Sequence, residues 1–258
     1  MSSSNAIEIV EVWKQFRIVR SGYAGIKGKL GALVKGVKPD VEIVGALKGV
    51  SLSIAPGETV ALLGSNGSGK STLLSLIAHV MRPDSGEVRF PHSADPTHPR
   101  LAPLLEVGAG FHPDLTGNQN VFFNGSIIGL SRAEMTDRYD AIIAFAELDA
   151  AKLDAPVRTY SSGEFVRLGF AVAVHTDPEI VLVDETLAVG DESFQQKCYR
   201  KMDEFHAQGR TIAFVSHDME AVRRVATRAV WLNKGAIAAD GPVDETIHAY
   251  HTAVNLPD

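Results

Sequence analysis

Short apolar runs alternate with longer apolar patterns of helical period along most of the chain. Apolar strands are expected at residues 7–18, 47–54, 60–63, 87–90, 178–184 and 210–215. Helices are expected at residues 120–128, 133–146, 194–208, 219–226 and 243–253, and a hairpin at residues 229–239. Strands that alternate with helices predict an α/β fold with a largely parallel sheet.

Three stretches depart from this alternation. Residues 21–45 combine many glycines and lysines with apolar residues at helical spacing, which predicts a short basic amphipathic helix. Such a helix could dock on a partner or on anionic headgroups, or it could be a solvated insert packed on its own domain. Residues 91–103 contain four prolines and are expected to form a loop. Residues from about 104 to 176 predict a helical lobe inserted into the α/β core.

A glycine-rich turn lies between the apolar strand at residues 60–63 and an apolar helix. Gly64, Gly69, Lys70 and Ser71 occupy the fixed positions of the pattern GxxxxGK[ST]. Glycines let successive backbone N–H groups surround phosphate oxygens, and the N-terminus of the helix attracts the same anion. Lys70 could reach the β- and γ-phosphates, and the Ser71 hydroxyl could ligate Mg²⁺. The alternative is a flexible loop that matches the pattern by chance.

Two acidic residues, Asp184 and Glu185, end the apolar run at residues 180–183. A wholly apolar strand is expected at the centre of a parallel sheet, and phosphate ligands lie at the carboxyl edge of such sheets. Asp184 is suited to hold Mg²⁺, directly or through water, and Glu185 could accept a proton from an attacking water. Alternatively, the two acids only cap a core strand.

Three further features of the sequence, a helix start, a histidine and an aromatic residue, suggest nucleotide contacts. Ser161 and Glu164 have the spacing of a capping box, so a helix is expected to begin there with its N-terminus facing a phosphate. One nucleotide does not need two such helix ends from one chain, so this one is expected to serve a neighbouring copy. His217 ends another strand and could contact a γ-phosphate, and Phe16 could be a platform for adenine. The alternatives are an ordinary helix start, a structural histidine and a buried edge aromatic.

Composition limits the class of protein. The chain has 258 residues and a net charge of −6, which argues against a general nucleic-acid binder. Cys198 is the only cysteine, so no internal disulfide can form, which fits a reducing cytoplasm. No apolar run approaches the ~18–20 residues that a membrane span needs, and the N-terminus lacks the pattern of a signal peptide. We therefore expect a cytoplasmic chain that reaches a membrane only through a partner.

In this order and spacing, the phosphate loop, the serine-glycine segment, the acid pair and the histidine resemble the ATPase subunits of ABC transporters over nearly the whole chain. The resemblance implies one domain over residues 1–258: a P-loop NTPase fold of the ABC type, with an antiparallel β subdomain and an inserted helical lobe. It implies catalytic roles for Glu185 and His217. It implies nucleotide contacts by Phe16, Gly64, Ser65, Asn66, Gly67, Ser68, Gly69, Lys70, Ser71, Thr72, Ser161, Gly163 and Asp191.

The cofactors implied are ATP and Mg²⁺, with Ser71, Asp184 and Glu106 as candidate metal ligands. Glu106 stands where the family pattern has glutamine, and it could ligate Mg²⁺ or orient water. Glu164 stands where the pattern has glutamine or methionine. Its charge would lie near a γ-phosphate unless the side chain folds back onto its capping box.

The finer resemblance is to the polysaccharide-export branch (O-antigen, capsule, teichoic acid), carried by residues 104–125, 160–174 and 183–198. It implies a homodimer at the cytoplasmic face of the inner membrane, paired with an integral membrane permease that contacts the lipid-linked glycan. Neither a C-terminal glycan-binding domain nor a nucleic-acid partner is expected. The alternatives are an ABC ATPase for another cargo, a soluble non-transport ABC ATPase and a small-molecule P-loop kinase.

Overall fold

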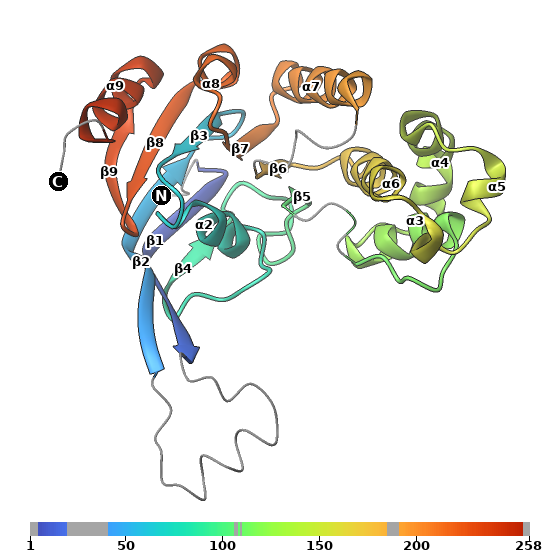
Figure 1. Ribbon diagram of the computed structural model, residues 1–258, viewed down its shortest axis with the longest axis horizontal. Coiled ribbons are helices and arrows are strands. Elements are labelled where there is room, and N and C mark those ends of the chain that lie inside the picture. Colours follow the sequence, from blue (N-terminus) through green and yellow to red (C-terminus); the bar gives the residue numbers. More distant parts are fainter. Residues whose placement is uncertain (1–4, 20–40, 106–107, 109, 185–190, 255–258) are drawn as a thin grey trace, which may run out of the picture.

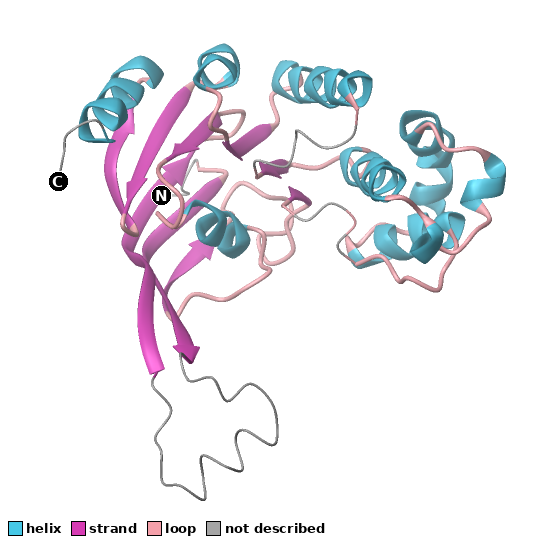
Figure 2. Ribbon diagram, in the orientation of Figure 1, coloured by secondary structure: helices cyan, strands magenta, loops and turns pink. Residues whose placement is uncertain are grey.

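The computed structural model describes residues 5–19, 41–105, 108, 110–184 and 191–254. Two β-sheets form the body of the molecule, and a group of helices forms a lobe at its side (Figures 1 and 2). The larger sheet has the order β5-β6-β7-β3-β8-β9. Its strands are β3 (Thr59–Leu63), β5 (Leu101–Leu104), β6 (Ile180–Val183), β7 (Thr211–Val215), β8 (Arg228–Asn233) and β9 (Ala236–Gly241). All neighbours pair in parallel except β8 and β9, which confirms the largely parallel sheet.

The smaller sheet is antiparallel and has the order β2-β1-β4. It comprises β1 (Ile7–Val19), β2 (Val41–Ile54) and β4 (Ser85–Arg89), and it forms the expected antiparallel subdomain. The distal parts of β1 and β2 extend from the body as a two-stranded ribbon (Figure 1). Residues 41–45 were expected to belong to the glycine-rich insert, but they pair with β1 as the start of β2. The rest of that insert, including the expected helix, lies outside the described residues.

The prediction of a loop over residues 91–103 is wrong at its C-terminal end, because Leu101–Leu104 form β5. This strand pairs in parallel with β6, and Pro103 lies opposite Leu182. Proline disfavours a central strand because it has no backbone N–H to donate to a neighbouring strand, but β5 is at the edge of the sheet and has one neighbour.

Each face of the larger sheet lies against a different core, and β3 is buried throughout. Val60 and Leu62 join the core that contains the smaller sheet and helix α2 (Lys70–Ile77). Ala61 and Leu63 join the second core, on the opposite face. Four helices contribute to this second core: α6 (Ser162–Val174), α7 (Glu192–Ala207), α8 (Met219–Val225) and α9 (Val243–Val254). Alternating residues of one strand therefore hold together three layers.

The lobe contains α3 (Gly117–Ile127), α4 (Arg132–Ala146), α5 (Ala150–Leu153), the 3₁₀ helix η1 (Val157–Thr159) and α6 (Ser162–Val174). Capping boxes begin α3, α4 and α6, so local sequence fixes where each of these helices starts. A separate apolar cluster fills the lobe and includes Val121, Ile142 and Leu168. Within the described residues, no helix has the length and apolar character needed to cross a membrane.

Two isoleucines of the lobe test this account of its core. Ile142 on α4 is 0% exposed and Ile127 on α3 is 59% exposed. We expect Ile142→Ala to lower the free energy of unfolding by about 2–5 kcal/mol, because it leaves a cavity. The matched change Ile127→Ala should cost less than about 0.5 kcal/mol. Urea unfolding of both variants measures the difference, and equal losses would contradict the burial of Ile142.

Candidate functional site

Three of the motifs found in the sequence meet at one edge of the larger sheet. β6, β7 and β3 are neighbours and run in parallel, so their carboxyl ends lie at the same edge. Val183 pairs with Phe214, and Leu62 pairs with Val215, which sets the three ends at nearly the same height. Asp184 follows β6, His217 follows β7 after one residue, and the glycine loop follows β3 directly. The sheet thus joins residues that are far apart in the sequence.

The glycine loop lines a cavity of about 530 Å³, and Asp184 lines the same cavity. Its walls come from the loop, the first turn of α2, the end of β6 and the β1–β2 ribbon. The lining residues are Phe16, Val44, Ala46, Asn66, Gly67, Gly69, Lys70, Ser71, Thr72 and Asp184. The structure therefore brings together the candidate phosphate-binding and metal-binding residues of the loop with Asp184.

The loop requires glycine where it turns into α2. Gly69 has φ 108°, and a Cβ there would lie 2.6 Å from the carbonyl oxygen of Ala46. No side chain caps the N-terminus of α2, whereas Thr116 and Ser161 cap α3 and α6 with their side-chain oxygens. The first N–H groups of α2 thus have no side-chain cap at the loop, as expected of a helix end that receives a phosphate.

Lys70 is 5% exposed, and its ammonium group bonds to the backbone of the loop. Its Nζ donates to the carbonyl oxygens of Gly64, at 2.8 Å, and Ser65, at 3.1 Å. A buried ammonium needs such acceptors, because desolvation without them is costly. The loop backbone therefore holds the lysine charge at the cavity before any phosphate is considered.

Phe16 is 39% exposed, so the interpretation of a buried edge aromatic is wrong. It lies opposite Val44 in the β1–β2 ribbon, and both residues line the cavity of the glycine loop. An exposed aromatic ring at the wall of this cavity has the chemistry to stack on a planar base.

His217 lines a second cavity, of about 310 Å³, between α7, α8 and the ends of β6 and β7. Asp184 lines both this cavity and that of the glycine loop. The described residues contain no group of three or more His, Cys, Asp or Glu side chains that could hold a metal ion. A Mg²⁺ ion held by Ser71 and Asp184 would therefore depend on phosphate and water oxygens, which is its usual coordination beside nucleotides.

The expected capping box at the start of α6 is confirmed. The Ser161 Oγ accepts the Glu164 N–H at 3.3 Å, and the Glu164 Oε2 accepts the Ser161 N–H at 2.7 Å. Lys152 Nζ lies 3.0 Å from the same oxygen of Glu164. The Ser161 N–H and Lys152 hold the pKa of the Glu164 carboxyl below its ordinary value. Glu164 thus folds back onto its own helix.

Ser161 and Gly163 do not meet the glycine loop within one chain. They line a separate cavity of about 540 Å³, which shares no described lining residue with that of the loop. Asp191 lines this serine cavity and caps α7, where its Oδ1 accepts the Phe194 N–H at 2.9 Å. The Phe194 N–H, the Ser193 hydroxyl and Arg167 lower the pKa of Asp191.

Two predicted residues, Glu106 and Glu185, lie outside the described residues. Two cations that were not among the predicted site residues, Lys152 and Arg167, line the serine cavity. Arg167 follows Gly163 by four residues and so lies on the same helical face, a signal that was available in the sequence. Lys152 comes from another helix, α5, and had no such signal.

Comparisons with known proteins identify relatives of the whole chain. A family model described as ABC transporter matches residues 47–188. An O-antigen export system ATP-binding protein of Myxococcus xanthus is 43% identical over 260 residues, which cover 99% of this chain and 58% of that protein. The chain thus spans little more than half the length of that relative. A protein of the same description from Klebsiella pneumoniae is 44% identical over 209 residues, covering 81% of this chain and 82% of the relative.

Among solved structures, a dimeric ATP-binding cassette in a post-hydrolysis state, bound to ADP and Pi, has a similar fold. The TM-score is 0.69 at 24% identity, and the match covers 92% of this chain and 98% of the other. At this identity the likeness shows the fold alone.

The lowered pKa of Glu164 leads to a prediction about pH. An ionised Glu164 stabilises the folded chain above the ordinary pKa of 4.5, and this contribution is lost as pH falls through the lower folded pKa. Glu164→Gln can keep the cap, as Gln119 does in α3, but loses the ion pair with Lys152. We expect the variant to be less stable by at most about 1 kcal/mol at neutral pH, since the pair is partly exposed.

Thermal unfolding from about pH 7 to about pH 3.5 measures this effect. The difference between the parent and Glu164→Gln should shrink as the pH falls. Lys152→Met, which removes the partner, should show the same trend. A difference that stays constant over this range would contradict the ionised pair.

Proposed function

Because the chain belongs to the ABC transporter family, we propose that it is the ATP-hydrolysing subunit of an exporter that moves a lipid-linked polysaccharide across the inner membrane. The observation that carries this proposal is the cavity in which the glycine loop, Lys70 and Asp184 meet. The export role is supported by two relatives described as O-antigen export ATP-binding proteins.

Bound ATP and Mg²⁺ would supply a reactive phosphate bond and a metal that neutralises its developing charge. In the proposal, Lys70 and the N–H groups at the start of α2 hold the phosphates. Ser71 and Asp184 hold Mg²⁺, with Glu106 as a further candidate. Phe16 stacks on the adenine ring.

Two residues would act on the water and the γ-phosphate. Glu185 follows Asp184 in the sequence, and it is proposed as the general base. His217 lines a cavity with Asp184, so it belongs to the same edge and is proposed to contact the γ-phosphate. Both residue types fit these roles, because a carboxylate can accept a proton from water and an imidazole can contact a phosphate oxygen.

We further propose that two copies work together. Ser161, Gly163 and Asp191 line a cavity distinct from that of the glycine loop, so one chain does not bring them to its own nucleotide. A two-fold dimer would place this surface of each copy over the nucleotide of the other. The solved ATP-binding cassette with a similar fold is a dimer bound to ADP and Pi, which supports this arrangement.

The remaining partner in the proposal is an integral membrane permease. It would contact the glycan and hold this subunit at the cytoplasmic face of the membrane. The net charge of −6 agrees with the absence of a nucleic-acid partner from the proposal. The alternatives are an ATPase for a different cargo and a soluble non-transport ATPase. The experiment below distinguishes polysaccharide export from both of them.

Glu185→Gln in the native cell tests the proposal. Because the variant would bind ATP but lack the general base, surface polysaccharide should fall strongly, and lipid-linked glycan should accumulate on the cytoplasmic side. Glycan extracted from the surface and from the membrane fraction measures both pools, at equal amounts of the variant and parent proteins. The matched control Glu245→Gln, at an exposed position on α9, should export normally. Unchanged surface and internal glycan in Glu185→Gln would contradict polysaccharide export.

A further inference from the structure

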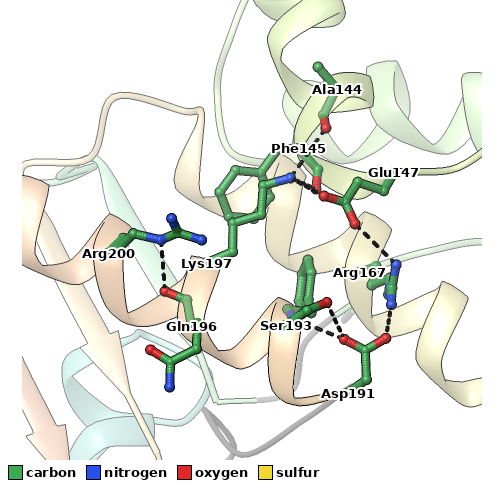
Figure 3. A network of polar contacts seen from close by, with 10 residues as sticks. Ala144, Phe145, Glu147, Arg167, Asp191, Ser193, Gln196, Lys197 and Arg200 are labelled. Carbon is green, nitrogen blue, oxygen red and sulfur yellow. Dashed lines mark hydrogen bonds and ion pairs between the residues drawn. The ribbon is translucent and has the colours of Figure 1, made fainter.

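Four side chains of alternating charge join the lobe to the start of α7 (Figure 3). One oxygen of Glu147 accepts Lys197 Nζ at 2.8 Å, and its other oxygen lies 3.4 Å from Arg167 Nη1. Arg167 Nη2 in turn pairs with Asp191 Oδ2. The second oxygen of Asp191, Oδ1, accepts the Ser193 hydroxyl at 2.7 Å and the Phe194 N–H. Every carboxylate oxygen of the network therefore has a donor.

The network connects three helices. Glu147 follows the last residue of α4, Arg167 is in the middle of α6, and Asp191 and Lys197 belong to the cap and second turn of α7. Lys197 Nζ also donates to the carbonyl oxygens of Ala144 and Phe145, at 3.3 and 2.9 Å, and so satisfies the C-terminus of α4. The start of α7 is thus held to the lobe at two points.

Aromatic rings lie beneath these charges. The Arg167 guanidinium is 5.3 Å from the centre of the Phe194 ring, and Lys197 Nζ is 4.7 Å from that of Phe145. Phe145 and Phe194 also contact each other edge to face. The two cations therefore lie between these rings and the carboxylates, and the Arg167 side chain is only 20% exposed.

The position of the network matters more than its strength. Ion pairs with exposed carboxylates contribute little to stability, and those of Glu147 and Asp191 are about half exposed. Arg167 and Asp191, however, line the serine cavity together with Ser161 and Gly163. The guanidinium thus links the residue that begins α7 to the helix that carries the serine-glycine segment.

We propose that Arg167 is a positioning residue, which holds Asp191 against α6 so that Ser161, Gly163 and Asp191 form one surface for the nucleotide of a second copy. This inference rests on the proposed function, because it requires an ATP-bound dimer. Arginine suits the role because its planar group directs separate N–H groups to Glu147 and Asp191 at once. Lysine has a single ammonium and cannot reproduce that geometry.

The test uses the full chain carrying Glu185→Gln, so that an ATP-bound dimer accumulates. Arg167→Lys is added to it, and dimer dissociation is measured by analytical ultracentrifugation with ATP and Mg²⁺. We expect the dissociation constant of the dimer to rise about tenfold, a typical size for coupling between sites. Glu147→Gln, which releases one side of Arg167, should give a smaller rise in the same direction.

Two measurements distinguish a positioning role from a loss of nucleotide binding or of folding stability. The affinity of the monomer for a fluorescent ATP analogue, and the melting temperature without nucleotide, should stay close to those of the Glu185→Gln parent. The matched control is Arg200→Lys, since the Nε of Arg200 donates to the Gln196 carbonyl of its own helix (Figure 3). It should leave the dimer unchanged.

The outcomes distinguish this inference from the proposed function. A parent that dimerises with ATP, together with an Arg167→Lys variant that dimerises equally well, would overturn the positioning role and leave the proposed function intact. A parallel loss of monomer affinity and melting temperature in Arg167→Lys would also overturn it, because the role would then be merely structural. A parent that stays monomeric with ATP would contradict the dimer on which both proposals depend.

Discussion

The parallel pairing of β6, β7 and β3 is the constraint on which the site depends. Parallel neighbours end at one edge, so the acid after β6, the histidine after β7 and the glycine loop after β3 have to meet there. The two apolar faces of β3 keep this arrangement in place, because each face is buried in a different core. The sheet can therefore be stable without any contribution from the polar residues at its edge.

The N-termini of α2, at the cavity of the glycine loop, and of α6, at the serine cavity, differ in how their backbone N–H groups are capped. α2 starts at Gly69 without a side-chain cap, beside a buried lysine that the loop carbonyls hold. α6 starts with a complete capping box, and its acid also pairs with Lys152. The first end thus suits direct contact with a phosphate of the same chain. The second is stable in the single chain, which agrees with a role that begins only when another copy approaches.

The sequence allowed prediction of what depends on local pattern. The glycine loop, the capping box at Ser161 and the apolar strand before Asp184 are contiguous signals, and each was found where it was expected. The β5 strand was missed because Pro103 disfavours strands in general, and only the sheet order reveals that β5 is an edge. The start of β2 was missed because its pairing with β1 crosses a long separation in sequence. The link from Arg167 to Asp191 joins two helices, so periodicity in one segment could not reveal it.

Crosslinking between copies tests the central claim most directly. Asn66→Cys and Ser162→Cys, both at exposed positions, place one thiol at the glycine loop and one at the serine cavity. The native Cys198 is buried, and burial raises its pKa to about 12, so it should not compete for a thiol reagent. In the Glu185→Gln chain, a short thiol crosslinker should give covalent dimers with ATP and few without it. A control with Ser131→Cys in place of Ser162→Cys should give none. Equal crosslinking with and without ATP, or none in either condition, would contradict a nucleotide held between the glycine loop of one copy and the serine cavity of the other.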